Sequence, residues 1–179
     1  IRECIGQGAF GAVYRAYQTV IDREVAIKII LPQYANQPDF IRRFEVEAQL
    51  IARLEYLHIV PLYDYWREPD GAYVVSRYLR GGSLAAVRAR GDTIAPARAL
   101  AIAQQVVSAL AFAHRQGLVH GNVAESNVLL DVDGNAYLGD FRIGRTERAA
   151  PAEDVAALAS LARRTLGDDA TPALRSLLE

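Results

Sequence analysis

The strongest constraint on the fold is a glycine-rich loop near the start of the chain, at residues 6–11, together with the strand-like segment directly after it. Gly6, Gly8 and Gly11 match a G-x-G-x-x-G pattern, which occurs in dinucleotide-binding folds, in other phosphate-binding loops and in ordinary turns. A dinucleotide-binding fold places a helix directly after the third glycine. Residues 12–17 instead continue as a strand, so the sequence predicts the tip of a β-hairpin. Such a tip can lay its backbone N–H groups over phosphates, whereas the alternative is a turn without a ligand.

The rest of the chain places strands first and helices second, which indicates an α+β fold in two unequal lobes. Strands are expected at residues 1–30 (three strands, with turns at 6–11 and 19–23), 59–66, 72–78, 128–130 and 136–138. Helices are expected at residues 38–54, from the N-cap Ser83 to residue 90, at 95–116, and from residue 154 to 166, where Gly167 ends the helix.

Composition places the chain among ordinary globular proteins. It has 179 residues, of which 51% are hydrophobic and 23% charged, and a net charge of −1. The balanced charge gives no indication of a nucleic-acid partner, and no apolar run reaches the roughly 18–20 residues that span a bilayer. The single cysteine, Cys4, excludes an intrachain disulfide and fits a reducing, cytoplasmic compartment. Because the sequence has no initiator Met and no closing helix cap, we expect a domain excised from a longer chain.

A lysine and a glutamate each interrupt an apolar segment. Lys28 ends the strand-like run Val-Ala-Ile-Lys at residues 25–28, and Glu47 lies on the apolar face of the helix expected at residues 38–54. A carboxylate within an apolar stripe is costly unless it is paired, so Lys28 is the expected partner of Glu47. The alternative is that Lys28 merely extends its ammonium group to water.

These features, together with two later motifs, resemble the eukaryotic-like serine/threonine protein kinases of bacteria. The resemblance runs from residue 1 to about residue 166. The glycine loop, the strand ending in Lys28 and the helix glutamate Glu47 occur at the family's spacing. Residues 119–127 align with the catalytic loop of the family, and residues 139–142 align with its metal-binding motif.

The resemblance implies an α+β, bilobal protein-kinase fold. Residues 1–79 would form a β-rich N-lobe with the hinge, and residues 80–179 a shortened, α-rich C-lobe. Only about a dozen residues separate Asp140 from Asp154, which is far fewer than the family uses for its activation segment and peptide platform. We therefore expect most of the activation segment to be missing.

The resemblance also implies a role for each aligned residue. Lys28, held by Glu47, is expected to reach the α- and β-phosphates of ATP, while Asn127 and Asp140 match the two metal ligands. Asp154 matches the helix aspartate that anchors the catalytic loop through its backbone. Four residues match the side-chain stack that links the lobes: Ile51, Leu62, His120 and Phe141. The implied nucleotide-binding residues are Ile5, Gly6, Gly8, Gly11, Val13, Ala26, Lys28, Arg77, Leu79 and Leu129.

Four departures from the family pattern bear on catalysis. Asn122 stands where the family has the aspartate that orients and deprotonates the acceptor hydroxyl. Ala124 replaces the lysine that steadies the γ-phosphate, and Gly121 replaces the arginine that pairs with a phosphorylated activation loop. Arg142 replaces the flexible glycine of the metal motif, and its cation beside Asp140 is expected to weaken the dependence on Mg²⁺.

The sequence therefore predicts a pseudokinase, a kinase-fold domain that binds ATP and acts as a regulatory or scaffolding module on a protein partner. A low-rate ATP-dependent kinase that uses Asn122 to position the hydroxyl is one alternative, and a nucleotide-free interaction scaffold is another. His58 and His114 are assigned to surface or helix-end positions without a functional role.

Overall fold

A computed structural model describes residues 1–144 and 150–166 of the chain. The described residues form two compact units. The first comprises Ile1–Glu55, Val60–Tyr78 and the segment that begins at Ile143. The second comprises Tyr56–Ile59, Leu79–Arg142 and the chain from Ala150 onward.

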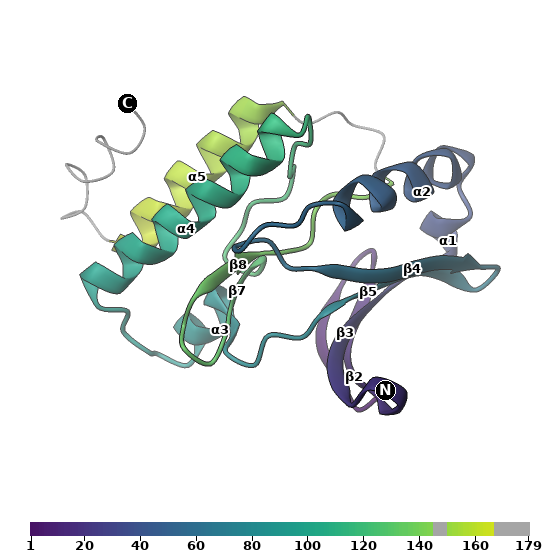
Figure 1. Cartoon of the computed structure of the whole chain (residues 1–179), viewed down its shortest axis with the longest axis horizontal. Coiled ribbons are helices and arrows are strands. Elements are labelled where there is room, and N and C mark those ends of the chain that lie inside the picture. Colours follow the sequence, from purple (N-terminus) through teal and green to yellow (C-terminus); the bar gives the residue numbers. More distant parts are fainter. Residues whose placement is uncertain (145–149, 167–179) are drawn as a thin grey trace. The chain divides into compact units, whose positions relative to one another are not determined.

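The first unit is built on a five-stranded antiparallel sheet with the strand order β1-β2-β3-β5-β4 (Figure 1). The three strands expected in residues 1–30, and the hairpin turn between the first two, are confirmed. The strand expected at residues 59–66 begins later, because Ile59 instead bridges to Leu138 within the second unit and Pro61 has no N–H to donate. The strands are β1 (Glu3–Gly8), β2 (Gly11–Gln18), β3 (Arg23–Ile30), β4 (Leu62–Glu68) and β5 (Gly71–Arg77).

Helix α2 (Pro38–Ala52) packs against one face of this sheet. Pro38 occupies its first turn, where the missing N–H costs nothing. Phe40 and Phe44 are stacked with their ring centroids 5.2 Å apart, and they share a core cluster with residues of β3 and β5. The buried members of this cluster are Ile30, Ala35, Phe40, Phe44, Ala72 and Val74. A further helix, α1 (Pro32–Ala35), was not expected, since four residues are too few to show a helical period.

The segment after the metal motif packs on α2 in the first unit. Ile143 contacts the core cluster, and Gly144 is buried with φ of +73°. A Cβ atom on Gly144 would lie 2.3 Å from Cδ2 of Phe40, so the close approach to the aromatic ring requires glycine. The backbone of Gly144 is therefore fixed against α2 both by its conformation and by packing.

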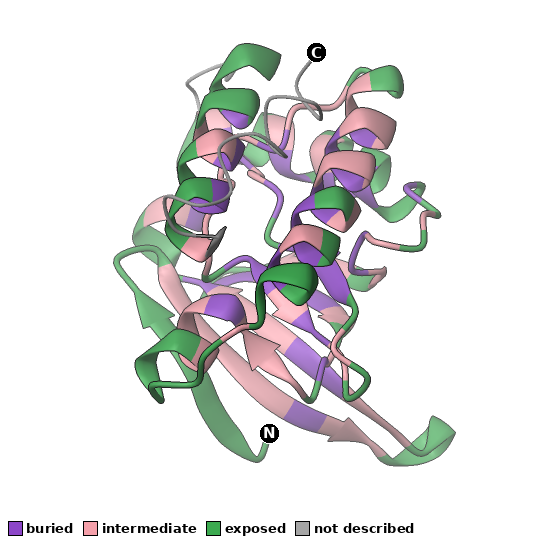
Figure 2. Cartoon of the chain, turned by 90° about the vertical axis from the view of Figure 1, so that its left-hand side faces the viewer, coloured by how far each residue is buried: buried purple, intermediate pink, exposed green. Residues whose placement is uncertain are grey.

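The second unit pairs two helices with a small sheet of order β6-β7-β8. Helix α4 (Pro96–Arg115) packs along α5 (Pro151–Leu166), and both have one buried and one exposed side (Figure 2). The predicted cap of α3 (Leu84–Ala89) is confirmed, because Oγ of Ser83 accepts a hydrogen bond from Ala86 N at 3.1 Å. The strands are β6 (Gly82–Ser83), β7 (Val128–Leu130) and β8 (Ala136–Leu138), and the last two match the prediction.

Helix α5 begins at Pro151, three residues earlier than the predicted start at Asp154. Glu153 explains the earlier start, because its Oε1 accepts a hydrogen bond from Ala150 N at 3.0 Å and thereby caps the first turn. The helix end predicted at Gly167 lies outside the described residues.

Among the described residues, α4 is the one helix with the length and apolar composition of a membrane-spanning segment. This is weak evidence for a span, since the core helix of a soluble protein has the same character. Seven residues of α4 are buried within the protein: Ala99, Ile102, Ala103, Val106, Ala109, Leu110 and Ala113.

Replacing Gly144 with alanine should destabilise the chain more than the same change at Gly91. Both glycines have positive φ, so each substitution costs roughly 1–2 kcal/mol in backbone strain. A Cβ on Gly91 would meet nothing within 4 Å, whereas one on Gly144 would clash with Phe40 and should add about 1–3 kcal/mol of overpacking. Urea unfolding of Gly144→Ala and Gly91→Ala measures the difference, and equal losses would show that the contact of Gly144 with α2 is not tight.

Candidate functional site

The glycine loop forms the tip of the β1–β2 hairpin, as predicted. Gly6 is paired with Val13 across the hairpin, and Gly8 with Gly11. The carbonyl oxygen of Phe10 accepts a hydrogen bond from Leu31 N at 2.9 Å, which ties the tip to the end of β3. The loop is thus held at its base, while Gly6 and Gly8 remain exposed.

The three glycine positions of the loop differ in whether the fold leaves room for a side chain. A Cβ on Gly11 would lie 1.8 Å from the carbonyl oxygen of Ile29, so the fold itself requires glycine there. A Cβ on Gly8 would meet nothing within 4 Å, and one on Gly6 would meet only Val13 at 3.9 Å. Neither Gly6 nor Gly8 is among the glycines with positive φ. Packing and backbone conformation therefore do not account for glycine at these two positions.

Strand pairing places several predicted nucleotide-binding residues on one face of the sheet. Val13 on β2 lies opposite Lys28 on β3, and Ala26 lies two residues before Lys28 on the same strand. Directly opposite residues, and residues two apart on a strand, share a face, so these three side chains project from one side of the sheet. Ile5 lies at an irregularity of β1 and is exposed, and Arg77 lies opposite Val25 at the end of β5.

Glu47 lies on α2 between Phe44 and Ile51, as the helical period predicted, and is partly buried. Its Oε2 accepts a hydrogen bond from the backbone N–H of Gly144 at 2.5 Å. This partner could not be foreseen from the sequence, because it is a main-chain group contributed by a distant segment. The ion pair of Glu47 with Lys28 stays a prediction.

Within the second unit, the carboxylate of Asp154 organises the catalytic-loop backbone. It is 1% exposed and accepts hydrogen bonds from the backbone N–H groups of His120 and Gly121, both at 2.8 Å. The imidazole of His114, at the end of α4, makes a third contact, with its Nε2 at 2.8 Å from Oδ2 of Asp154. The sequence alone predicted a surface or helix-end position for His114 and no such role. Its place in the last turn of the helix that leads into the loop was the one available signal.

His120 is completely buried and connects the loop to the metal motif. Its Nδ1 accepts a hydrogen bond from Asn122 N at 3.1 Å, so Nε2 carries the proton and donates to the carbonyl oxygen of Gly139 at 2.9 Å. Burial lowers the pKa of His120 below its usual value, which keeps the ring neutral. The ring also contacts Phe141, with centroids 4.4 Å apart.

The two predicted metal ligands, Asn127 and Asp140, are both held through Asn122. Nδ2 of Asn127 donates to the carbonyl oxygen of Asn122 at 2.7 Å, so Oδ1 is the atom that can serve as a ligand. Oδ1 also accepts a hydrogen bond from Oγ of Ser126 at 3.3 Å, which leaves one lone pair for a metal. The side chain of Asn122 donates through Nδ2 to Oδ2 of Asp140 at 3.2 Å. Asp140 has φ of +58°, a conformation that aspartate tolerates better than most residues. Amide and carboxylate oxygens are hard donors of the kind Mg²⁺ prefers, so these residues fit a magnesium ion.

The two candidate metal ligands together carry only one negative charge, that of Asp140. The described residues contain no group of three or more His, Cys, Asp or Glu side chains able to hold a metal. One of the two Asp140 oxygens already accepts the hydrogen bond from Asn122. Any divalent cation would therefore depend on a single carboxylate of the chain and on the phosphates of a nucleotide.

The remaining predicted positions of the second unit contribute backbone or apolar groups. Ala124 has no polar side-chain atom, and its carbonyl oxygen accepts the N–H of Asn127 at 2.9 Å. Leu129 lies in the centre of β7, opposite Tyr137, and Leu79 is buried. The chain thus lacks a side-chain cation at position 124, as the sequence indicated.

Comparison with known proteins agrees with these features. The family described as protein kinase domain matches residues 1–158 of the chain. Serine/threonine-protein kinase PrkC of Bacillus subtilis is 41% identical over 143 residues, which are 80% of this chain and 22% of that protein. Serine/threonine-protein kinase PknE of Mycobacterium bovis is 40% identical over 143 residues, which are 80% of this chain and 25% of that protein. The chain therefore spans about a quarter or less of the length of these relatives.

Solved structures support the same assignment. The PknI kinase domain of Mycobacterium tuberculosis superposes with a TM-score of 0.77 at 27% identity, covering 91% of this chain and 71% of that one. Rad53 in complex with AMP-PNP superposes with a TM-score of 0.76 at 21% identity, covering 93% of this chain and 47% of that one, which supports the fold alone. The chain belongs to the protein kinase family and is related to bacterial serine/threonine kinases, with the β-rich unit as its N-lobe and the helical unit as a shortened C-lobe.

Proposed function

We propose that this chain is a pseudokinase domain that binds ATP, transfers phosphate very slowly or not at all, and regulates a protein partner in the cytoplasm. One observation carries the nucleotide-binding part. The chain has 20 basic residues, and Lys28 is its only lysine, since the other basic residues are all arginine. If this side chain only extended its charge into water, an arginine would serve there as it does elsewhere in the chain. A lysine is expected where a compact ammonium group binds a phosphate as a point charge.

The glycine loop supports the same proposal. Gly6 and Gly8 have neither the positive φ nor the close packing that would require glycine. Glycine in the middle of a strand is also slightly unfavourable, by roughly 0.5–1 kcal/mol relative to alanine. A ligand that lies close to the backbone at these positions explains why side chains are absent there. Phosphate oxygens, which accept hydrogen bonds from backbone N–H groups, are such a ligand.

The proposed loss of catalysis rests on Asn122 and Ala124. An amide cannot accept the proton of an acceptor hydroxyl, and the Asn122 amide donates to Asp140 instead. A general base contributes about 10²–10⁴ in rate, and one preorganised donor to transition-state charge contributes about 10²–10³. If the two losses add, transfer would be slower by roughly 10⁴–10⁷, or about 5–10 kcal/mol. A bound Mg²⁺ would supply neutralising charge to the phosphates, but it would not replace the missing base.

The low-rate kinase is the second candidate, because Asn122 retains a polar group at the position of the base. Phosphoryl transfer depends mostly on positioning and electrostatics, so an amide that orients a hydroxyl would preserve some activity. The hydrogen bond of Asn122 to Asp140 weighs against this candidate, since it directs the amide toward another group.

ATP should stabilise the chain, and replacement of Lys28 should abolish the effect. At an ATP concentration of 100 times Kd, binding raises the free energy of unfolding by about 2.7 kcal/mol. Thermal-shift measurements should find this stabilisation in the parent and not in Lys28→Ala or Lys28→Arg. The reciprocal change on the same strand, Arg23→Lys, serves as the control and should retain it. An unchanged melting temperature of the parent at millimolar ATP would favour the nucleotide-free scaffold, and normal binding by Lys28→Arg would refute the argument from the single lysine.

Binding of ATP should depend only weakly on magnesium. Asp140 accepts a hydrogen bond from Asn122, and Arg142 adds a cation two residues along the chain, so the carboxylate is partly compensated without a metal. Chelation by EDTA should therefore weaken ATP binding by about threefold or less, and Arg142→Ala should increase the effect of Mg²⁺. A loss of all binding on chelation, with no change in Arg142→Ala, would contradict this expectation. Isothermal titration calorimetry with and without EDTA gives the comparison.

Repair of the motif residues should not restore phosphorylation of a peptide. The triple variant Asn122→Asp, Ala124→Lys and Arg142→Gly returns the base, the γ-phosphate lysine and the flexible glycine. Gly121 is left unchanged, because its φ of +69° would strain an arginine. The variant does not lengthen the segment between Asp140 and Asp154, and orientation of the acceptor can supply about 7–11 kcal/mol of the barrier.

Transfer of phosphate is measured by incubating the parent and repaired chains with radiolabelled ATP and a generic basic protein substrate. We expect slow ATP hydrolysis by the repaired chain, since water needs no platform, and no labelling of the substrate. Robust labelling by the repaired chain would show that the short segment suffices. Labelling by the parent would instead favour the low-rate kinase.

A further inference from the structure

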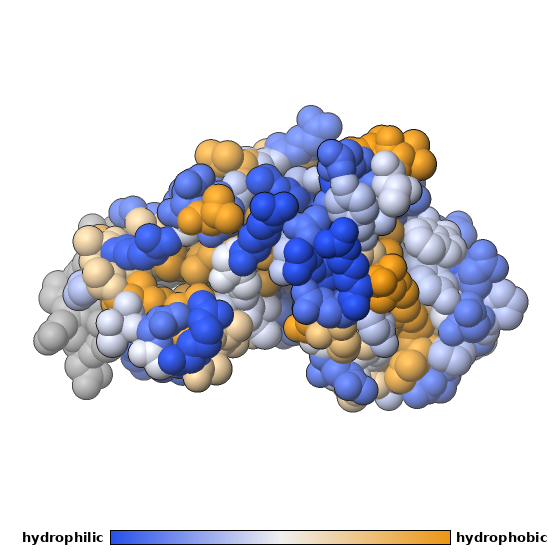
Figure 3. All heavy atoms as spheres, turned by 90° about the horizontal axis from the view of Figure 1, so that it is seen from below, coloured by the Kyte–Doolittle hydropathy of each residue, from blue (hydrophilic) through white to orange (hydrophobic). Residues whose placement is uncertain are grey.

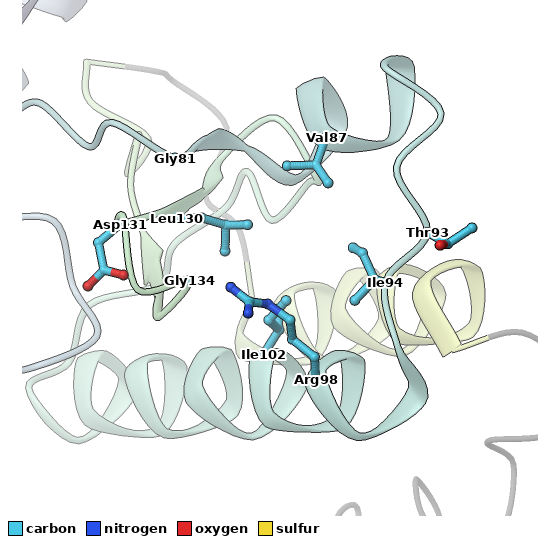
Figure 4. A pocket seen from close by; sticks show the side chains of 9 residues that line it. All are labelled: Gly81, Val87, Thr93, Ile94, Arg98, Ile102, Leu130, Asp131 and Gly134. Atoms are coloured by element: carbon cyan, nitrogen blue, oxygen red, sulfur yellow. The ribbon is translucent and has the colours of Figure 1, made fainter.

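The C-lobe contains a pocket between α3, α4 and the β7–β8 turn. Its volume is about 330 Å³, at the lower end of the ~300–1,000 Å³ typical of small-ligand sites. Figure 4 shows its lining, to which α3, the α3–α4 connection, α4 and the β7–β8 turn all contribute. In Figure 3, apolar surface lies among charged side chains on the face of the molecule that carries α3 and this turn. The apolar side chains of the pocket are Val87, Ile94, Ile102 and Leu130.

A guanidinium group projects into this apolar lining. Figure 4 shows the side chain of Arg98 directed from α4 toward Gly134 in the β7–β8 turn. A Cβ on Gly134 would lie 1.0 Å from Nη2 of Arg98, so a glycine at this position leaves the space that the guanidinium occupies. The glycine has φ of +80°, which the turn also requires. The turn and the arginine therefore fit each other.

Arg98 has little of its hydrogen-bonding capacity satisfied. Within the part of the chain that the structure describes, its side chain makes one hydrogen bond, a long one of 3.4 Å from Nη2 to the carbonyl oxygen of Asp133. Within the same residues, it forms no ion pair with a carboxylate. A guanidinium has five N–H donors, so most of them remain available to a ligand.

The carboxylate that lines the same pocket is already saturated. Oδ1 of Asp131 accepts the backbone N–H groups of Asp133 and Asn135, at 3.0 and 2.8 Å. Oδ2 accepts Nδ2 of Asn135 at 3.0 Å and the hydroxyl of Tyr137 at 3.3 Å. Burial acts to raise the pKa of Asp131, but the hydrogen bonds from Asn135, Asp133 and Tyr137 together outweigh it and lower the pKa. Asp131 thus stabilises its own turn and, as Figure 4 shows, lies at the edge of the pocket.

We propose that this pocket binds a small apolar carboxylate, whose chain packs on Val87, Ile94, Ile102 and Leu130 while its carboxylate pairs with Arg98. An apolar wall beside a cation that has no carboxylate partner among the described residues matches a ligand with an apolar body and one negative charge. The proposal does not rest on nucleotide binding. The bound ligand would contact both the α3–α4 connection and the β7–β8 turn. Strand β7 begins directly after Asn127, and β8 ends shortly before Asp140. Occupancy would thereby stiffen β7 and β8, which lie next to these two residues in the chain.

Octanoate is a suitable probe, and octanol, with the same chain and no charge, is its control. Titration of the ¹⁵N-labelled chain with octanoate should shift the amide resonances of Thr93, Ile94 and Gly134 saturably. Octanol should bind about two- to fivefold more weakly, which is the range expected for one partly exposed charged pair. Arg98→Gln should reduce octanoate affinity to the level of octanol. Arg163→Gln, which removes an exposed arginine from α5, should leave the affinity unchanged.

Three results would overturn the proposal. Equal affinities of the parent for octanoate and octanol would show an apolar site without charge recognition. An unchanged octanoate affinity in Arg98→Gln would exclude the guanidinium as the recognition group. Resonance shifts confined to residues outside the pocket, or no saturable shifts, would show that the carboxylate does not bind there. Because Arg98 is exposed, its replacement should not prevent folding, and the ¹⁵N spectrum of the free variant checks this.

Discussion

The conformation of the C-lobe loop at residues 119–127 depends on the hydrogen bonds that the carboxylate of Asp154 accepts from its backbone. A loop that turns sharply leaves backbone N–H groups without helix or strand partners, and such groups are costly when buried. Asp154 satisfies the N–H groups of His120 and Gly121 together, and His114 holds the carboxylate from α4. Because α4 and α5 pack along each other, His114 on α4 and Asp154 on α5 are held within hydrogen-bond distance. His120 in turn contacts the next segment, through a hydrogen bond to the carbonyl oxygen of Gly139 and a ring contact with Phe141.

The loop architecture is preserved although its sequence departs from the family pattern. The contacts that shape the loop use main-chain groups, the ring of His120 and the carboxylate of Asp154, and none of them uses the side chains that depart from the family pattern. Substitution of the base by Asn122 therefore costs the fold little. It also adds a bond, because an amide can donate to Asp140 where a second carboxylate would repel it. Because the loop is shaped by other groups, the kinase fold can tolerate substitutions at positions 121, 122 and 124.

The glycine loop of the N-lobe shows the opposite division, since packing does not require glycine at two of its three glycine positions. Gly11 is fixed by its approach to Ile29, but Gly6 and Gly8 could carry a side chain without a clash. Lys28 lies on a central strand of a chain that otherwise uses only arginine. Glu47 meets the main chain at Gly144, so the segment after the metal motif and helix α2 are held together in one unit. Glycine at positions 6 and 8 therefore has no packing reason in the fold, and the proposed nucleotide accounts for it.

The sequence by itself determined the order of strands and helices, the hairpin form of the glycine loop, the cap at Ser83 and the kinase family, because periodicity, turn residues and motif spacing are local properties of the chain. It misplaced the start of β4 and of α5, where a bridge from Ile59 and a cap from Glu153 decided the boundary. Only the tertiary structure decided which groups meet: His114 with Asp154, Asn122 with Asp140, and Gly144 with Glu47. Each of these contacts joins residues at least 18 positions apart through a specific geometry of donor and acceptor. No pattern of neighbouring residues encodes such a contact, because it exists only once packing has brought the two segments within hydrogen-bond distance.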